Sequence, residues 1–214
     1  MRRGVVITGR GSISALGHDA PTCWQAMREG RSGIGTIAAV APELLKAPIA
    51  AEVRDFDPLK HFDEKKLVLL DRVSQFALVA AREAVAQSGI DFRADGLGDA
   101  TAVIIGTGVG GENTNDQASR RLYAENNPRL HPLTIVRLMA NAPACQISIE
   151  FGLTGPAFAV SSACASANHA MAQAFHMVRS GMCDAAVTGG TEACRSLHAR
   201  CDHRQSRIDQ RAAF

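Results

Sequence analysis

The sequence lacks a long apolar run, a marked excess of one charge and any cysteine pair spaced as C-x-x-C. Its 23 lysines and arginines stand against 21 acidic residues, and this net charge of +2 gives no reason to expect a nucleic acid or an anionic membrane as partner. No apolar run approaches the roughly 20 residues of a membrane helix. The run after Arg2 and Arg3 stops at Gly9, too short for a signal peptide. These absences predict a cytoplasmic protein with no membrane span.

The six cysteines follow no spacing typical of a disulfide framework. In a reducing compartment we therefore expect free thiols. His198, Cys201 and His203 are close together in the sequence, but their spacing fits no zinc pattern, so no metal is predicted. The cysteines are Cys23, Cys145, Cys164, Cys183, Cys194 and Cys201.

Three segments share one pattern, a short apolar run with β-branched residues that ends in glycine. They are GVVITGRG (4–11), TAVIIGTGVGG (101–111) and DAAVTGGTE (184–192), and FAVSSA (158–163) is a weaker fourth. Continuous apolar runs suit strands that are buried on both faces, as in a parallel sheet covered by helices. We expect these runs to form such a sheet.

Helical patterns alternate with the strand-like runs, which is typical of an α/β fold. Start and stop signals predict a helix over 19–30, and an apolar stripe predicts a second over 72–89. The segment 165–181 is apolar around most of its helical circumference. This predicts a third helix that is buried on all sides.

The remaining segments are less regular. Residues 31–64 are expected to form a long connection with one short strand, IAAEV (49–53), and residues 112–156 an insertion over one end of the sheet. Residues 195–214 hold five arginines and show no apolar periodicity, which predicts a disordered tail. We therefore predict a folded domain over 1–194 and a tail over 195–214.

Cys164 lies in the stretch SSACASANHA (161–170), between a strand-like and a helix-like run. At a helix start, unpaired N–H groups and the helix dipole stabilise a thiolate by up to about 2 kcal/mol. Small neighbours leave room for a substrate, and a backbone N–H can supply half of an oxyanion hole. These features favour a nucleophile, but most cysteines are simply buried small hydrophobic residues. Both interpretations remain open.

The stretches SSACASANHAMAQAFHMVRSG (161–181) and CDAAVTGGTEA (183–193) closely resemble the active-site region of β-ketoacyl-acyl-carrier-protein synthases. VVITGRGSISALG (5–17), GTGVGG (106–111) and MANAPACQISIEFGLTGPAFAV (139–160) resemble the same family in the same order. The resemblance covers roughly residues 4–194. It points to the synthase II type and its nodulation-type relatives.

That resemblance implies a thiolase-like layered α/β fold, of which this chain is the N-terminal half, and a homodimer. It also implies decarboxylative Claisen condensation of an acyl group with malonyl-carrier protein in fatty-acid or related acyl-chain biosynthesis. Acyl-carrier protein is then the partner, and no cofactor is needed. Cys164 matches the cysteine that takes the acyl chain, and its N–H matches one oxyanion donor. Val109 matches an aliphatic position beside the acyl chain, although packing under the insertion explains it equally well.

Gly106, Gly108 and Gly111 of GTGVGG fit the G-x-G-x-x-G spacing of dinucleotide-binding loops. This short match alone is a weak signal, and no NAD site is predicted. Turn geometry is the simpler explanation for these glycines.

The resemblance ends after TEAC (191–194), about half way through the family pattern. The family's two catalytic histidines, its lysine and its second oxyanion donor belong to the unmatched part. His169 follows Cys164 by five residues, which is about 7.5 Å along a helix axis and too far for direct proton transfer. His169 and Asn168 are therefore expected to be hydrogen-bonded core groups. We expect the isolated chain to be inactive in condensation.

Other interpretations stay open at this point. A non-catalytic dimer partner, or a degraded pseudoenzyme, would supply surface to a complete synthase, although the presence of Cys164 argues against a dedicated pseudoenzyme. An unrelated cysteine hydrolase would need a Cys/His signature that the sequence lacks. A frameshift after codon 194 would explain the arginine-rich tail, and a genuine solvated extension is the alternative.

Overall fold

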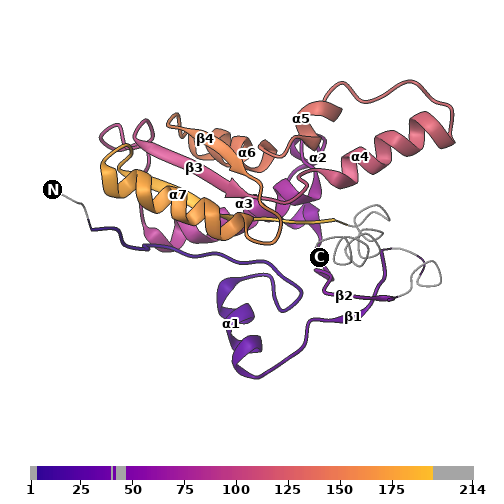
Figure 1. Cartoon of the computed structure of the whole chain (residues 1–214), viewed down its shortest axis with the longest axis horizontal. Helices are drawn as coiled ribbons and strands as arrows, with labels where there is room; N and C mark the ends of the chain where they lie inside the picture. The colour runs from indigo at the N-terminus through magenta and orange to yellow at the C-terminus, as the bar shows by residue number, and fades with distance from the viewer. Residues whose placement is uncertain (1–3, 40, 42–46, 195–214) are drawn as a thin grey trace, which may run out of the picture.

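The computed structural model describes residues 4–39, 41 and 47–194 (Figure 1). The predicted tail over 195–214 lies outside these residues, so the domain boundary at 194 stays a prediction. The elements in chain order are α1 (Ala20–Arg28), β1 (Gly35–Thr36), β2 (Ile49–Ala50), η2 (Pro58–Lys60), α2 (Glu64–Leu67), α3 (Arg72–Ser88), β3 (Thr101–Gly106), α4 (Glu112–Ser119), η3 (Arg120–Ala124), α5 (Thr134–Leu138), α6 (Ala142–Phe151), β4 (Ala157–Val160), α7 (Ser166–Ser180) and β5 (Ala185–Gly190).

Three parallel strands form the main sheet, in the order β4-β3-β5. In this register Ile104 of β3 pairs with Phe158 of β4 and with Thr188 of β5. Every residue of β3 is buried, as expected of a central strand with helices on both sides. The parallel sheet predicted from the runs at 101–111, 158–163 and 184–192 is therefore confirmed, and with it the α/β fold class.

Alternate side chains of β3 enter two separate cores. Val103 and Ile105 pack with the buried faces of α3 and α6. Ala102 and Ile104 pack with α7. The sheet is thus the middle of three layers, with α7 on one face and α3 and α6 on the other (Figure 1).

Helix α7 is less buried than its sequence predicts. Met171 and Phe175 are 44% and 38% exposed, so the prediction of a helix buried on all sides is wrong for the described structure. The sheet covers one side of α7, so the helix buries one face and exposes the other. Its buried residues recur every three or four positions and are Ser166, Ala170, Ala174 and Met177.

The N-terminal run over 4–11 forms no strand within the part of the chain that the structure describes. Val6 and Ile7 are 80% and 91% exposed, and the backbone of Ser12 donates to the Glu83 carboxylate of α3 at 2.9 Å. The segment therefore approaches a helix, whose backbone groups are already paired and offer no ladder. The prediction of a strand here is wrong for that reason.

The connections also differ from their predictions. The strand expected over 49–53 shortens to β2, which pairs antiparallel with β1. The segment 112–156 divides into two parts rather than forming one insertion. Helix α4 projects away from the sheet (Figure 1), whereas α6 packs on α3 through the buried Ala144 and Ile147. None of the described helices has the length and apolar character that crossing a bilayer requires.

Asp71 joins the start of α3 to the start of α4. This carboxylate is 2% exposed. Its Oδ1 caps α3 by accepting the N–H of Val73 at 3.1 Å. Its Oδ2 accepts the N–H and the hydroxyl of Thr114 at 2.8 and 2.6 Å, and Asn113 donates to Oδ1 at 3.3 Å. The loop between β3 and α4 is therefore held in place from α3.

Replacing Asp71 by Asn is expected to lower the free energy of unfolding by about 1–3 kcal/mol. Both oxygens of Asp71 accept hydrogen bonds, whereas the side chain of Asn has one oxygen and one NH₂ group, which can only donate. At least one buried hydrogen bond is therefore lost. Denaturant titration measures the change. The matched control is Asp63→Asn, because Asp63 caps α2 from an exposed position and Asn is as good a cap as Asp. Equal stability of the two variants would contradict the role of Asp71.

His61 is partly buried where the 53–62 segment meets α3. Its ring stacks on Phe56 with centroids 5.2 Å apart, and its carbonyl oxygen accepts from the Arg82 guanidinium at 2.8 Å. Burial, and then the positive charge of Arg82, lower the pKa of His61 below its ordinary value of 6.5. The nearby Asp57 acts in the opposite direction, and more weakly.

This lowered pKa predicts that the protein loses stability as the pH falls below about 6.5. There the unfolded chain binds the His61 proton more readily than the folded one, so protonation favours unfolding; above that pH both states carry a neutral ring. The unfolding free energy at pH 7.5 and pH 5.5 tests this. His61→Gln should reduce the loss between the two pH values, whereas His176→Gln, on the exposed side of α7, should leave it unchanged. An equal loss in His61→Gln and wild type would disprove it.

Candidate active site

Cys164 lies in the turn between β4 and α7. The helix begins at Ser166 after the N-cap residue Ala165, so Cys164 lies just before the first helical turn, close to the place expected from the sequence. Its side chain is exposed. In the described structure it is therefore not a buried small hydrophobic residue.

The turn that carries Cys164 is strained. Ala163 has a φ of 52°, in the left-handed region that residues other than glycine rarely adopt. Strained backbone of this kind concentrates at functional sites. The end of β3 packs directly under the turn, because a Cβ on Gly106 would lie 2.3 Å from the carbonyl carbon of Ser166. Only glycine allows this approach.

The loop between β3 and α4, residues 107–111, is called here the glycine loop, and it lies beside the Cys164 turn. Ser161 donates its hydroxyl to the carbonyl oxygen of Gly108 at 3.2 Å. From the opposite side Glu192, just after β5, accepts the N–H of Gly108 at 2.7 Å. The carboxyl ends of all three strands thus meet at one edge, where parallel α/β sheets place their ligands.

Val109 occupies the glycine loop and is 50% exposed. The Ser161–Gly108 hydrogen bond brings its loop beside the turn of Cys164. The contact of Val109 with an acyl chain stays a prediction. Its exposed side chain leaves room for that contact.

Cys23, Cys183 and Cys194 are less available for reaction than Cys164, and Cys145 is half-buried. Cys23 and Cys183 are 4% and 3% exposed. Cys194 lies beside Glu192, with its Sγ 3.4 Å from Oε1. Burial, and then the negative charge of Glu192, raise the pKa of Cys194 to about 12. Cys194 therefore stays a protonated thiol at neutral pH.

His169 and Asn168 are exposed, so their assignment to the core is wrong. The Nδ1 of His169 is hydrogen-bonded to the hydroxyl of Ser162 at 2.6 Å. Sequence patterns predicted neither this pair nor the role of Glu192. One feature of the sequence could have pointed to Glu192, because it is a single acidic residue directly after an apolar strand. No sequence pattern pointed to the Ser162–His169 pair, because the conformation of the turn between the two residues sets the distance between their side chains.

The described residues contain no group of three or more His, Cys, Asp or Glu side chains that could hold a metal ion. His198, Cys201 and His203 lie outside those residues.

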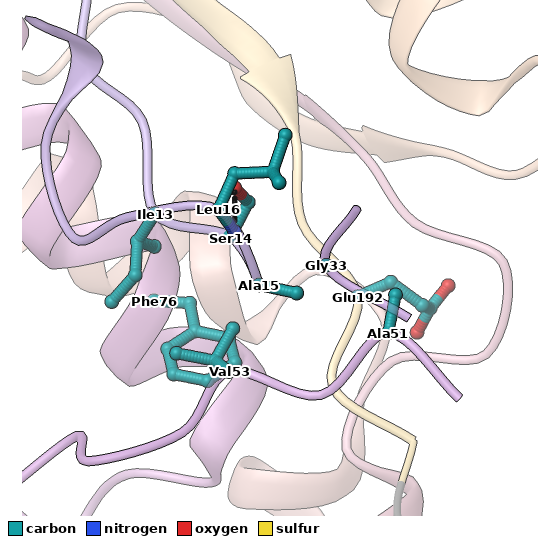
Figure 2. Close-up of a pocket in the computed structure, with 9 residues that line it drawn as sticks. All are labelled: Ile13, Ser14, Ala15, Leu16, Gly33, Ala51, Val53, Phe76 and Glu192. Carbon is teal, nitrogen blue, oxygen red and sulfur yellow. Dashed lines mark hydrogen bonds between the residues drawn. The ribbon is translucent and has the colours of Figure 1, made fainter. Parts of the chain in front are cut away.

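A cavity of about 400 Å³ lies beside the N-terminal loop 13–16 (Figure 2). Neither Cys164 nor Val109 lines it, so it is not the place for an acyl chain attached to the Cys164 sulfur. Glu192 is shared, since it faces this cavity and holds the glycine loop. The lining residues are Ile13, Ser14, Ala15, Leu16, Gly33, Ala51, Val53, Phe76 and Glu192.

The model of the family described as "Beta-ketoacyl synthase, N-terminal domain" matches residues 2–212. The chain belongs to the β-ketoacyl synthase family. The family match extends beyond residue 194, into the segment predicted to be a tail, and the structure does not describe that segment.

Two curated relatives of this β-ketoacyl synthase domain agree with that assignment. Nodulation protein E of Rhizobium meliloti (strain 1021) is 40% identical over 193 residues, which are 90% of this chain and 48% of that protein. 3-Oxoacyl-[acyl-carrier-protein] synthase 2 of Staphylococcus aureus (strain N315) is 37% identical over 189 residues, 88% of this chain and 45% of that protein. The chain therefore spans about half the length of the curated relatives it matches.

Solved structures of ketosynthases share the fold. The ishigamide ketosynthase/chain length factor superposes with a TM-score of 0.85 at 31% identity, covering 96% of this chain and 51% of that one. A β-ketoacyl synthase from Burkholderia phymatum STM815 gives 0.79 at 25% identity, covering 96% and 50%. The thiolase-like fold expected for this β-ketoacyl synthase domain is therefore confirmed, as is its correspondence to about half of a complete subunit.

We predict that Cys164 is the most reactive thiol of this β-ketoacyl synthase domain, because it is exposed, whereas Cys23 and Cys183 are buried, Cys145 is half-buried and Cys194 stays protonated. Limited alkylation of the folded protein, mapped by peptide mass, measures the order of labelling. Cys164→Ala should remove the fastest phase, whereas Cys194→Ala should leave it intact. Preferential labelling of Cys23, Cys145 or Cys183 would contradict the prediction.

Proposed function

We propose that this domain transfers an acyl group to Cys164 and takes part in decarboxylative condensation with a malonyl thioester. The observation that carries the proposal is the exposed Cys164 on a strained turn at the carboxyl edge of the sheet. The backbone N–H of Cys164 makes no hydrogen bond to another described residue, so it is free to meet an oxyanion.

The first step is acyl transfer. The Cys164 thiolate attacks the carbonyl carbon of an acyl thioester, and the carbonyl oxygen becomes a negatively charged oxyanion that the Cys164 N–H stabilises. The bond from carbon to the carrier sulfur then breaks and the carrier leaves as a thiolate. The product is an acyl thioester on Cys164.

The second step is condensation. The malonyl thioester loses its carboxylate as CO₂, and the electron pair of the broken bond forms an enolate. The enolate carbon attacks the carbonyl carbon of the acyl thioester, and the Cys164 thiolate leaves. Within the described residues we find no further group placed to stabilise the enolate. We therefore assign this step to an assembled synthase, in line with the family resemblance.

We propose acyl-carrier protein as the partner that delivers both thioesters. One solved structure of the same fold is a type II PKS acyl-carrier protein in complex with its ketosynthase, which supports this choice. We further propose a homodimer in the cytoplasm. Exposed apolar side chains on η3, on α5 and on the residue after α5 support pairing, and they include Leu122, Tyr123, Ile135, Val136 and Met139.

A non-catalytic partner subunit is the second candidate function. It is favoured by solved structures of the same fold in which a ketosynthase occurs together with a chain length factor. An acyl group on Cys164 would decide for catalysis, and its complete absence for the partner role.

From the isolated 214 residues we expect slow acylation of Cys164 and no β-ketoacyl product. Only one oxyanion donor is identified, and loss of one donor typically costs about 10²–10³ in rate. Incubation with acyl- and malonyl-carrier protein, followed by mass spectrometry of Cys164 and of the product, measures both. Cys164→Ala is the control for acylation at other sites. Product at a typical enzymatic rate without an added subunit would refute this expectation.

Enlarging Val109 to Phe is expected to shorten the acyl chains that Cys164 accepts, because a larger side chain overfills the space beside the chain. The measurement compares acylation rates from carriers loaded with short and long acyl groups. Val68→Phe is the matched control, since Val68 is similarly exposed, at 48%, on a different element. A chain-length profile unchanged from wild type would count against a role for Val109.

A further inference from the structure

We propose that Ser166 and His169 are positioning residues that hold the Cys164 turn in its strained form. In this form the N–H of Cys164 is available to the thioester oxygen. The inference rests on the proposed acyl transfer to Cys164. It adds two side chains that the family resemblance did not assign.

The buried Ser166 makes two hydrogen bonds to the turn, called here the inner tie. Its hydroxyl accepts the N–H of Ser162 at 2.8 Å and donates to the carbonyl oxygen of Ala163 at 2.7 Å. One side chain thus bonds the residue before the strained Ala163 and Ala163 itself. Ser166 is 3% exposed, so water does not compete for these bonds.

His169 makes one exposed hydrogen bond to the turn, called here the outer tie. Its Nδ1 is hydrogen-bonded to the Ser162 hydroxyl at 2.6 Å, one helical turn beyond Ser166. Ser162 is therefore held through its backbone by Ser166 and through its side chain by His169. Both ties start from the first turns of α7, which packs on β3 and β5.

The ties act against a fixed support. The backbone of Ser166 lies against Gly106 so closely that no side chain fits there, and a Cβ on Gly190 would lie 2.5 Å from the Cβ of Ala167. The first turn of α7 therefore cannot move toward the sheet. The hydroxyl of Ser166 is held at a set height above β3, and the turn is held with it.

The consequence concerns the amide of Cys164. The turn uses the N–H of Ala165 to bond Ser162 and the N–H of Ser166 to bond Ala163. The N–H between Ala163 and Ala165 in sequence, that of Cys164, is left without an acceptor among the described residues. If Ala163 relaxed to a negative φ, the peptide that carries this N–H would rotate. The hydrogen bonds of Ser166 and His169 therefore keep the Cys164 N–H oriented as an oxyanion donor. This role is separate from the reactivity of the Cys164 sulfur.

The experiment compares two reactions of Cys164 in Ser166→Ala. Acylation by an acyl-carrier thioester needs the aimed N–H, and we expect its rate to fall by about 10-fold or more, up to the 10²–10³ that loss of an oxyanion donor costs. Alkylation by iodoacetamide needs only an exposed thiol, and we expect its rate to stay near that of wild type. Ser180→Ala is the matched control, because Ser180 also bonds a carbonyl of α7 through its hydroxyl. Equal acylation by wild type and Ser166→Ala would overturn the inference.

Hydrogen exchange of the 161–165 segment provides a readout that does not depend on acyl transfer. In Ser166→Ala the amide of Ser162 loses its acceptor, and we expect it to exchange about tenfold faster or more. Unchanged exchange would also overturn the inference. If exchange responds but wild type is never acylated, the proposed function fails while the positioning role stands. If Ser166→Ala does not fold, His169→Ala carries the comparison of acylation with alkylation, because His169 is exposed and its loss removes only the hydrogen bond to the Ser162 hydroxyl.

Discussion

The parallel alignment of β3 with β4 and β5 is the constraint on which the candidate site depends. Because all three strands run in one direction, their carboxyl ends meet at one edge of the sheet. Each end leads into a different part of the site, namely the glycine loop, the Cys164 turn and the segment with Glu192. An antiparallel neighbour would have sent one of these segments to the far edge.

Polar side chains then hold these three segments in register. Asp71 anchors the start of α4 from α3, Glu192 anchors Gly108 from the end of β5, and Ser161 connects Gly108 to the Cys164 turn. Asp71 is the most buried of the three, so its hydrogen bonds face little competition from water. The site is therefore a network across elements, even though Cys164, the proposed nucleophile, lies on a single turn.

Local patterns in the sequence were enough to predict several features correctly. Three of the apolar runs became the parallel strands β3, β4 and β5, and the central strand β3 is buried throughout, as a continuous apolar run predicts. The edge strands β4 and β5 are partly exposed. The place of Cys164 at a strand-to-helix turn also follows from local pattern. The strand expected over 4–11 failed because a strand depends on a partner elsewhere in the chain. The burial of helix α7 was overestimated because periodicity does not say how many neighbours a helix has.

The sequence by itself determined the fold class, the position of Cys164 and, through the motifs, the family. Only the tertiary structure decided that Cys164 is exposed, that Ala163 is strained, and that Ser166, His169 and Glu192 hold the surrounding loops. The physical reason is the distance along the chain between the residues that interact. Burial and periodicity are local properties that neighbouring residues encode, whereas Glu192 meets Gly108 across 84 residues of chain. Such contacts exist only once the sheet has brought its strand ends together.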